Sequence, residues 1–365
     1  MMAANQTTLL AHAQLPEITI DDVIYHTMYP VVVVGRYVHC VWYIIGFAGN
    51  TISALIWNTN HMYDVCSTAH YLVTLSCCDV ICQFLHVFYY VKVYWGVKSF
   101  DSAVLCELWS LLYMIPLFIS ELLVLGFTAE KLVSIRNPFR SGWFNRHQRA
   151  PKEIVWIVVS VTVLVFPQAY FWDVDNRGYC DHHKQIDKWE YPIWHWTIDA
   201  FIYLVTPFSV VIINCFIMQE AKQVTLATVA RKRDMTPLRQ STLVLLRLSF
   251  YRVVTLLPST ILYFLEFMEE FRPSKLPVVY NMSEVNESSA WHRYTVFSTI
   301  RLCAGILSSS RNAVSILIFT YTSTHFQREL VTMTTKTLRA FSMCGRKVVA
   351  RVTNNLRTLQ ENSDA

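Results

Sequence analysis

Residues 105–132 read LCELWSLLYMIPLFISELLVLGFTAEKL, a stretch whose only acidic residues are Glu107, Glu121 and Glu130. An α-helix rises about 1.5 Å per residue, so a helix of this length exceeds the ~30 Å hydrocarbon core of a bilayer. The stretch therefore predicts a steeply tilted membrane helix. One end of this helix carries Cys106, and the other end carries Glu130 followed by Lys131.

The composition of the whole chain agrees with a membrane protein. Hydrophobic residues make up 53% of its 365 residues and charged residues only 16%, whereas about a quarter of a typical soluble domain is charged. Apolar runs long enough to cross a bilayer cover approximately residues 37–57, 69–91, 105–132, 153–172, 194–218, 242–267 and 294–321. The sequence thus predicts an all-α membrane protein, a bundle of seven transmembrane helices.

The charge between these runs predicts which connections face the cytoplasm. The segments 131–152, 219–242 and 322–365 hold 6, 5 and 7 Lys or Arg, while 1–30, 92–104, 172–193 and 268–293 hold 0, 2, 3 and 3. Because basic loops stay in the cytoplasm, the second group and the N-terminus are expected outside. The Asn-X-Ser/Thr glycosylation sequons fall on the same side, at Asn5, Asn281 and Asn286. Two independent signals therefore predict a multi-pass plasma-membrane protein with an extracellular N-terminus.

One membrane domain is the expected organisation, since no repeat or low-complexity stretch divides the chain. We expect an extracellular segment over residues 1–34, the membrane domain over 35–330 and a basic cytoplasmic tail over 331–365. Residues 320–330 are expected to form a short amphipathic helix along the membrane, where the basic tail contacts anionic lipid. No Lys or Arg precedes Arg36, so the first span is expected to act as its own insertion signal.

The ten cysteines reduce to one expected disulfide once they are placed on this topology. Only Cys106 and Cys180 lie at the outer face, where oxidising conditions favour a disulfide. The bond would tie the third helix to the second outer loop. The alternative is a pair of free thiols.

Several short motifs lie along the spans in a specific order. The first span contains GFAGN at residues 46–50 and the second contains LSCCD at residues 75–79, and Trp156, Pro207 and Pro258 follow in the fourth, fifth and sixth spans. In this order and spacing, residues 35–330 resemble the rhodopsin-like (class A) G-protein-coupled receptors. The resemblance implies a receptor that signals through a heterotrimeric G protein, with no catalytic residues, cofactor, metal ion or nucleic-acid partner.

A finer resemblance is to the invertebrate peptide receptors of the myosuppressin and FMRFamide type and to the nematode serpentine receptors of class w. It is carried by STLVLL at residues 241–246, LLP at 256–258 and SxxFxREL at 323–330. This resemblance implies that the extracellular ligand is a neuropeptide.

Three activation motifs depart from the family pattern. Glu-Lys-Leu at residues 130–132 replaces Asp/Glu-Arg-Tyr, which keeps a cation but loses the planar fork of Arg. Leu256 stands where the family has an aromatic residue two positions before Pro258. The NPxxY motif is replaced by residues 315–319, or by 316–320 in a register one residue later. A constitutively active or decoy receptor, or a non-peptide chemosensory one, therefore stays an alternative.

Charged residues inside the spans predict an internal switch, because each costs about 2.5–3.5 kcal/mol near the bilayer centre. We expect Glu121 and Arg252 to form a buried ion pair beside Pro207; the alternative is that pocket water or other polar groups solvate each of them. Asp79 stands where the family helps to hold a sodium ion, and it would face Arg311 in the earlier register, whereas the later register turns Arg311 toward lipid or a neighbouring helix. The residues of the expected activation switch are Asp79, Glu121, Glu130, Lys131, Pro207, Arg252, Pro258, Arg311 and Asn312.

The outer halves of the spans offer a ligand pocket. Tyr113 stands where amine receptors carry an aspartate, and the seventh span has no lysine for retinal, so neither amines nor light are expected inputs. Asp199 lies eight residues before Pro207 and would pair with an arginine or amine of a peptide, or else bond to neighbouring helices. Five acids against three bases in residues 172–193 favour a basic or amidated peptide. The expected pocket residues are His86, Tyr113, His195, Asp199 and Glu266.

Two other classes of membrane protein fit the sequence less well. A polytopic enzyme would need a reactive constellation, but His61, His70 and His86 do not form a metal-ligand motif and we find no nucleophile motif. A transporter would be expected to show internal repeats and helices interrupted by Gly or Pro. The sequence favours a receptor over both.

Overall fold

The structure is a computed structural model that describes most of the chain. The described residues are 26–59, 69–97, 102–136, 143–174, 180–182, 190–229, 236–265 and 281–339, together with Val23, Met62, Leu276, Pro277 and Val279. The long helices are α3 (Tyr29–Trp57), α5 (Ala69–Trp95), α6 (Ala103–Arg136), α7 (Trp143–Val165), α9 (Thr206–Val229), α10 (Thr236–Leu265) and α12 (Ser289–Ser309). The shorter elements are η1 (Phe166–Phe171), β1 (Trp172–Val174), β2 (Cys180–His182), α8 (Glu190–Ala200), the π-helix η2 (Phe201–Val205), α11 (Met282–Glu287), η5 (Ser310–Asn312) and α13 (Ser315–Thr322).

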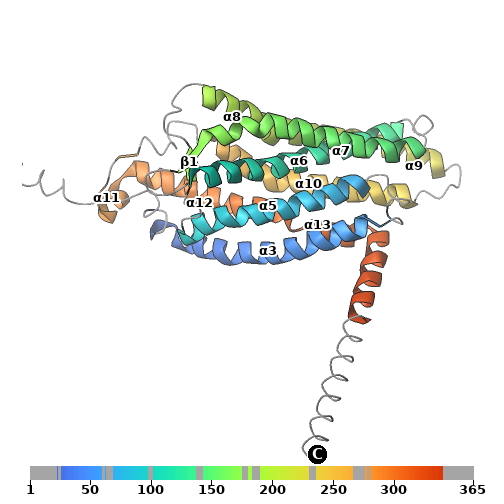
Figure 1. The fold of residues 1–365 in the computed structure, drawn as a ribbon, viewed down its shortest axis with the longest axis horizontal. Helices are drawn as coiled ribbons and strands as arrows, with labels where there is room; N and C mark the ends of the chain where they lie inside the picture. The colour runs from blue at the N-terminus through green and yellow to red at the C-terminus, as the bar shows by residue number, and fades with distance from the viewer. Residues whose placement is uncertain are drawn as a thin grey trace, which may run out of the picture.

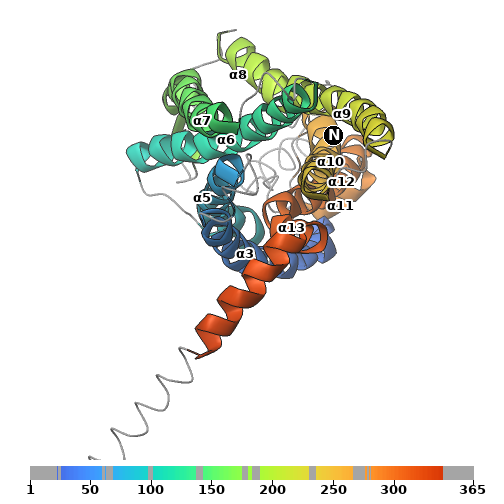
Figure 2. The same ribbon diagram turned by 90° about the vertical axis from the view of Figure 1, so that its right-hand side faces the viewer.

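These helices form the bundle that the sequence predicts. Within the described residues, six helices are long and apolar enough to cross a membrane, and the bent pair of α12–η5 with α13 makes the seventh span. The helices α3, α5, α6, α9, α10 and α12 close a ring in which each packs on the next, and α7 packs against α5 and α6 outside this ring (Figure 1 and Figure 2). The prediction of an all-α membrane bundle is confirmed, with the short β1–β2 ladder as a small addition to it.

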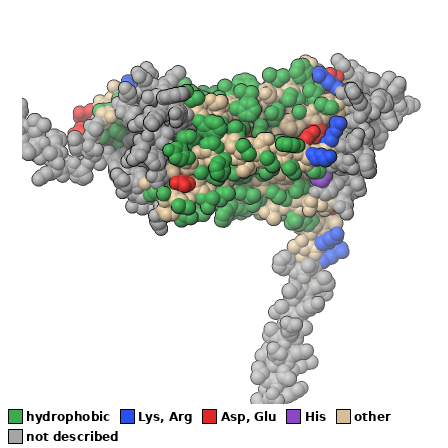
Figure 3. Space-filling model, turned by 45° about the horizontal axis from the view of Figure 1, so that its top comes forward, with side chains coloured by type: hydrophobic (Ala, Val, Ile, Leu, Met, Phe, Trp, Pro, Cys, Tyr) green, Lys and Arg blue, Asp and Glu red, His purple; other side chains and the backbone are tan. Residues whose placement is uncertain are grey.

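Apolar side chains cover the outside of the bundle. On the face shown in Figure 3 they fill the middle, while most of the visible Lys and Arg side chains lie toward the end where the helix over residues 324–339 leaves. Ile44, Val163 and Phe250 are among the apolar side chains that project from the surface. A belt of this kind suits lipid, because hydrocarbon offers polar groups no hydrogen-bond partner.

The helix α6 is the longest described element and crosses the bundle obliquely in Figure 2. Its 34 residues span roughly 51 Å at 1.5 Å per residue. A hydrocarbon core of about 30 Å accommodates this length only if the helix tilts. The tilt lets α6 contact α5, α7 and α9 along its course.

A π-helical turn, η2, precedes Pro207 in the fifth span. Proline lacks an N–H and its ring clashes with the carbonyl four residues earlier, so a regular α-helix cannot run through it undisturbed. The chain widens here instead, and the backbone N–H and side-chain hydroxyl of Thr206 both donate to the carbonyl of Phe201. A π-helical turn holds one residue more than an α-helical turn, so it rotates α8 relative to α9 about the helix axis.

The seventh span is broken between α12 and α13, which meet at 51°. The break follows a run of serines and contains neither Gly nor Pro. The carbonyl of Asn312 that the break releases accepts a hydrogen bond of 2.5 Å from Nδ2 of Asn50. Beyond the break, Phe319 is fully buried against Trp57 and Phe326. Phe319, which takes the tyrosine position of NPxxY in the earlier register, is therefore part of the core, and the register itself stays a prediction.

The helix after α13 begins later and extends further than residues 320–330. It covers residues 324–339 and follows a break at Ser323, whose hydroxyl accepts from the N–H of Phe326. Phe326 is buried, and Leu330 and Met333 pack against the core, so one face of its first turns is apolar. The helix then leaves the bundle, as Figure 1 shows.

The glycines of α3 are points of close helix contact. A Cβ at Gly46 would lie 1.9 Å from Nε2 of Gln83, and one at Gly49 would lie 2.6 Å from Cγ2 of Ile316. A Cβ at Gly35 would lie 2.2 Å from Cε1 of Tyr94, a buried ring that also packs on His39. These positions need glycine because a neighbouring helix approaches the α3 backbone.

Gly35→Ala is expected to lower the free energy of unfolding by about 1–3 kcal/mol, because the Tyr94 ring has to move out of a packed cluster. The matched control is Gly305→Ala, since no heavy atom would lie within 4 Å of the new Cβ. That substitution should leave stability unchanged or slightly higher, as alanine favours a helix over glycine. Thermal unfolding of the two purified variants measures the difference, and equal midpoints would contradict the close approach at Gly35.

Candidate functional site

A disulfide and a short β-ladder close one end of the bundle. Cys106 at the start of α6 is bonded to Cys180 in β2, which confirms the pairing predicted from the sequence. The strand β2 pairs antiparallel with β1. The carbonyl of Cys180 accepts a hydrogen bond of 2.8 Å from Nζ of Lys92 in α5. This hydrogen bond and the disulfide together hold the ladder against α5 and α6.

A cavity of about 630 Å³ lies beneath this ladder. Its volume is in the range of sites that enclose small molecules or the end of a larger ligand. It runs from Trp172 in β1 down to Arg311 and Asn312 at the break in the seventh span. Its side walls come from α3, α5, α6, α8, η2, α10 and α12. The aromatic side chains of these walls include His39, Tyr43, His86, Tyr89, Trp109, Tyr113, Tyr203, Tyr263 and Tyr294.

Aromatic stacking fixes one wall of the cavity. The rings of Trp109 and Tyr113 are stacked 5.5 Å apart, and Tyr113 lies 6.2 Å from the ring of His86. Nδ1 of His86 shares a hydrogen bond of 2.7 Å with the hydroxyl of Tyr43. The wall combines flat apolar faces with a few polar edges, which suits a ligand that carries both aromatic and hydrogen-bonding groups.

Asp199 supplies an acidic group to the opposite wall. It is 4% exposed, and its Oδ2 accepts a hydrogen bond of 2.7 Å from the hydroxyl of Tyr263. Met114 and Gln168 lie nearby, around a much smaller hollow that Asp199 also lines. The hydrogen bond from Tyr263 is the kind of contact with a neighbouring helix that the sequence left as an alternative for this carboxylate.

Three of the five predicted pocket residues come together in this cavity. His86, Tyr113 and Asp199 all line it. The side chain of His195 and the whole of Glu266 lie outside the described residues. Three cations that the sequence did not assign to the pocket also line the cavity: Lys92, Arg301 and Arg311. An arginine within an apolar span was the available signal for Arg301, because such a residue normally faces a polar cavity.

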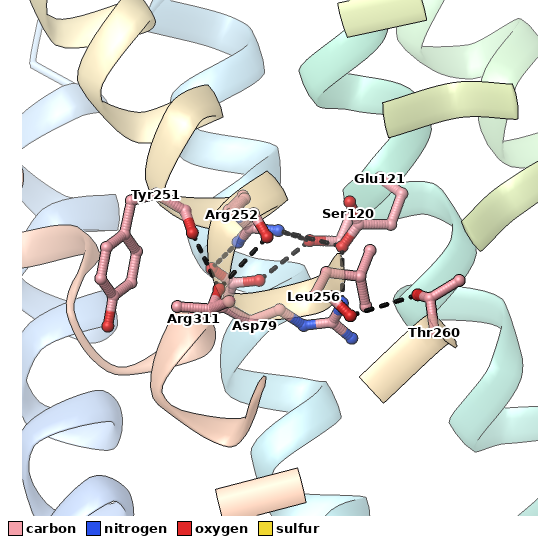
Figure 4. A network of polar contacts seen from close by, with 9 residues as sticks. Asp79, Ser120, Glu121, Tyr251, Arg252, Leu256, Thr260 and Arg311 are labelled. Carbon is pink, nitrogen blue, oxygen red and sulfur yellow. Dashed lines mark hydrogen bonds and ion pairs between the residues drawn. The ribbon is translucent and has the colours of Figure 1, made fainter. Parts of the chain in front are cut away.

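Two acids and two arginines form a buried charge cluster below the cavity (Figure 4). Nη2 of Arg252 lies 2.5 Å from Oδ2 of Asp79, and both side chains are 1% exposed. Ser120 joins them, since its hydroxyl donates to Oδ1 of Asp79 over 2.9 Å and accepts from Nη1 of Arg252 over 2.8 Å. The two oxygens of Asp79 are thus both occupied by side chains of other helices.

Glu121 has two cationic neighbours in the same cluster. Its Oε1 lies 3.0 Å from Nη1 of Arg311 and 3.6 Å from Nη1 of Arg252. The predicted pair of Glu121 and Arg252 is therefore present, but the closest partner of Arg252 is Asp79. We term the four residues Asp79, Glu121, Arg252 and Arg311 the charge cluster.

The partner predicted for Asp79 was wrong. The guanidinium beside Asp79 belongs to Arg252, while Arg311 pairs with Glu121. The reason is that Ser120 of α6 and Arg252 of α10 occupy both oxygens of Asp79, which leaves Glu121 as the carboxylate beside Arg311. Arg311 is 6% exposed, so the alternative in which it faces lipid is also excluded.

The end of α6 that lies away from the disulfide buries part of its acid–base pair. Lys131 is 5% exposed and Glu130 is half-buried. One turn later, Nε of Arg136 donates to Oε1 of Glu220 in α9 over 3.0 Å. The exposed cation at this end of α6 is therefore Arg136.

The remaining predicted residues lie as follows. Pro207 is buried near the start of α9, Pro258 lies inside α10, and Asn312 lines the floor of the cavity. Asn281 caps α11, Asn286 lies within it, and both are exposed, whereas Asn5 is outside the described residues.

A bundle of seven spans, a disulfide at one end and a deep cavity beneath it define a heptahelical membrane receptor. A family model described as "7 transmembrane receptor (rhodopsin family)" matches residues 49–312. The chain belongs to this family, so it is a multi-pass receptor of the plasma membrane and not an enzyme, and membership implies G-protein-coupled signalling. No curated protein matches the chain. The finer resemblance to particular peptide receptors stays a prediction.

Proposed function

We propose that this receptor is activated by an extracellular peptide, basic or amidated, whose end enters the cavity. The observation that carries the proposal is a carboxylate, Asp199, in the wall of an otherwise largely aromatic cavity. A buried carboxylate attracts a cationic group strongly because little water competes for it. The proposed topology has residues 1–34 outside the cell and the basic residues 331–365 inside, near anionic lipid and the G protein.

The other charges in the cavity limit where the basic group of a peptide would lie. Lys92 and Arg301 also line it, so the cavity as a whole is not acidic. A basic side chain is therefore placed at Asp199, and acceptors such as peptide carbonyls are placed toward Arg301. His195 and Glu266 belong to the proposed pocket as well, on the grounds of sequence alone.

Activation is proposed to act through the charge cluster. Asp79, Arg252 and Arg311 come from three different spans, so any change in how these spans pack must change the pairs. The further parts of the proposed switch are Glu130, Lys131, Pro207, Pro258 and Asn312. The buried, charged contacts make this switch stiff, because separating one partner from a buried pair is costly.

A screen of amidated neuropeptides on cells that carry G-protein dissociation sensors tests the proposal. A dose-dependent response that Cys106→Ser abolishes supports a peptide receptor and identifies its G protein. No response at full surface expression would favour the alternative, a decoy or non-peptide receptor. The observation that supports this alternative is the burial of Lys131.

Asp199→Asn is expected to weaken an arginine-containing agonist about 10- to 100-fold, because a charge-assisted hydrogen bond is worth about 1.5–3 kcal/mol. The measurement is the half-maximal concentration in the same sensor assay. Glu107→Gln is the matched control, since Glu107 is an acid of α6 that does not line the cavity. Replacing the peptide's arginine by neutral citrulline should remove the difference between wild type and Asp199→Asn. An equal loss with citrulline would contradict the role of Asp199.

A further inference from the structure

Arg247 lies on a face of α10 that otherwise presents apolar side chains outward. The exposed side chains of this face are spaced three or four residues apart, which places them on one side of the helix. They are Arg247, Phe250, Val254, Leu257 and Ile261. On α13, which packs against α10, Leu317 and Tyr321 are exposed at the same spacing. Arg247 therefore continues a surface that is otherwise suited to lipid.

The depth of Arg247 places it near one boundary of the hydrocarbon. An α-helix rises about 1.5 Å per residue, so Arg247 lies roughly 27 Å along α10 from Leu265, the last residue of the helix. Since the hydrocarbon core is about 30 Å thick, the apolar face between these two residues nearly fills it. Beside Arg247 lies Tyr321, and tyrosine is typical of the interface between hydrocarbon and headgroups. The guanidinium can therefore reach the headgroups.

Two residues of α13 hold this guanidinium in place. Nη1 of Arg247 donates a hydrogen bond of 3.2 Å to Oγ1 of Thr322, and Cζ lies 5.0 Å from the centre of the Tyr321 ring. Thr322 occupies only one of the five N–H donors of the guanidinium. In the part of the chain that the structure describes, no carboxylate lies within ion-pair distance of Arg247. The side chain is thus fixed in position but keeps unused donors and an unbalanced positive charge.

The position of this charge indicates what kind of group would bind it. Next to hydrocarbon, a guanidinium needs a counter-ion because little water solvates it. A phosphodiester at the level of the headgroups carries one negative charge, and its two free oxygens match the planar fork of Arg. The acyl chains of the same lipid would cover the apolar side chains one turn deeper, Phe250 of α10 and Leu317 of α13. A soluble phosphate has no group that covers these side chains.

We propose that Arg247, Tyr321 and Thr322 form a binding site for the phosphodiester of an anionic phospholipid. The lipid bridges α10 and the seventh span, because its phosphate binds Arg247 and its chains cover both helices. In the proposed topology the site faces the cytoplasmic leaflet, where anionic lipids give the membrane a negative surface potential. The site depends neither on the ligand of the cavity nor on the basic residues 331–365.

The test adds lipids with matched acyl chains to the purified full-length receptor in detergent. Dioleoyl phosphatidylglycerol is expected to raise the unfolding midpoint by about 2 °C more than dioleoyl phosphatidylcholine, whose choline cation balances its phosphate. Arg247→Gln should remove this difference, whereas Arg247→Lys should keep part of it, because Lys keeps the charge but loses the fork. Glycerol 3-phosphate at the same concentration should have no effect, since it has no acyl chains.

Arg136→Gln is the matched control for Arg247→Gln. Arg136 is also an exposed arginine, at the end of α6 away from the disulfide, but Glu220 already pairs with it over 3.0 Å. This variant should therefore respond to phosphatidylglycerol as the wild type does. Native mass spectrometry gives an independent measurement, in which the wild type should retain an additional phosphatidylglycerol molecule relative to Arg247→Gln.

Four results would overturn the proposal. They are equal responses of the wild type and Arg247→Gln, no difference between the two lipids, an effect of glycerol 3-phosphate as large as that of phosphatidylglycerol, and an equal loss of response in Arg136→Gln. The last result would mean that the response follows the net charge of this end of the bundle and not the site at Arg247.

Discussion

Arg252→Met is expected to lower the free energy of unfolding by about 3–5 kcal/mol, the largest effect of a single substitution that we anticipate. Removing one partner of a buried ion pair leaves the other charge uncompensated. Here Arg252 is 1% exposed and contacts Asp79 over 2.5 Å and Glu121 over 3.6 Å, so one substitution leaves two acids facing one arginine. The measurement is thermal unfolding of the purified receptor together with its surface expression.

The control for this substitution lies one and a half turns earlier on the same helix. Arg247 donates to Oγ1 of Thr322 over 3.2 Å and lies over the ring of Tyr321, in an exposed position, so Arg247→Met should cost far less. Asp79→Asn combined with Arg252→Met should recover part of the loss, because it removes an unpaired charge. Equal unfolding midpoints for Arg252→Met and Arg247→Met would refute the central role of Arg252.

Cys106→Ser is expected to cost about 2–4 kcal/mol and to abolish agonist responses. The disulfide joins residues 74 positions apart and anchors β2 to α6. Without it the ladder keeps the bond from Lys92 to Cys180 but loses its covalent link, and Trp172 no longer has a fixed place at the mouth of the cavity. Surface labelling and the sensor assay measure the two consequences separately.

Two cysteine variants serve as controls for this loss. Cys77→Ser alters a free cysteine on the outside of α5 and should behave as wild type. Cys106→Ser with Cys180→Ser should be no worse than the single change, since the bond is already absent. A Cys106→Ser receptor with normal expression and potency would show that the disulfide does not support the site.

The spans and the disulfide were accessible to sequence reasoning for a physical reason. A run of about twenty apolar residues has few places to lie other than a bilayer, and the topology then leaves Cys106 and Cys180 on one face. These features depend on local composition and on the order of the spans. They do not depend on how each helix is rotated.

The pairing of the buried charges depends on the rotation of each helix about its axis and on its depth in the bundle, and the sequence leaves both open. The sequence identified the four charged residues of the cluster, but the partner that it predicted for Asp79 was wrong. The sequence does not show how the helices that carry these four residues are rotated toward one another, so it does not show which acid each arginine faces. Whether Arg301 faces the cavity or lipid depends in the same way on the rotation of α12.

Arg311 is both the floor of the cavity and a member of the charge cluster. A ligand group at the floor and a change of partners within the cluster therefore both involve the side chain of Arg311, and each affects the other. Thermodynamic linkage makes such coupling reciprocal. Whatever stabilises a re-paired cluster would change the affinity of a group at the floor by the same factor, so binding of a G protein would be measurable as a change in ligand dissociation.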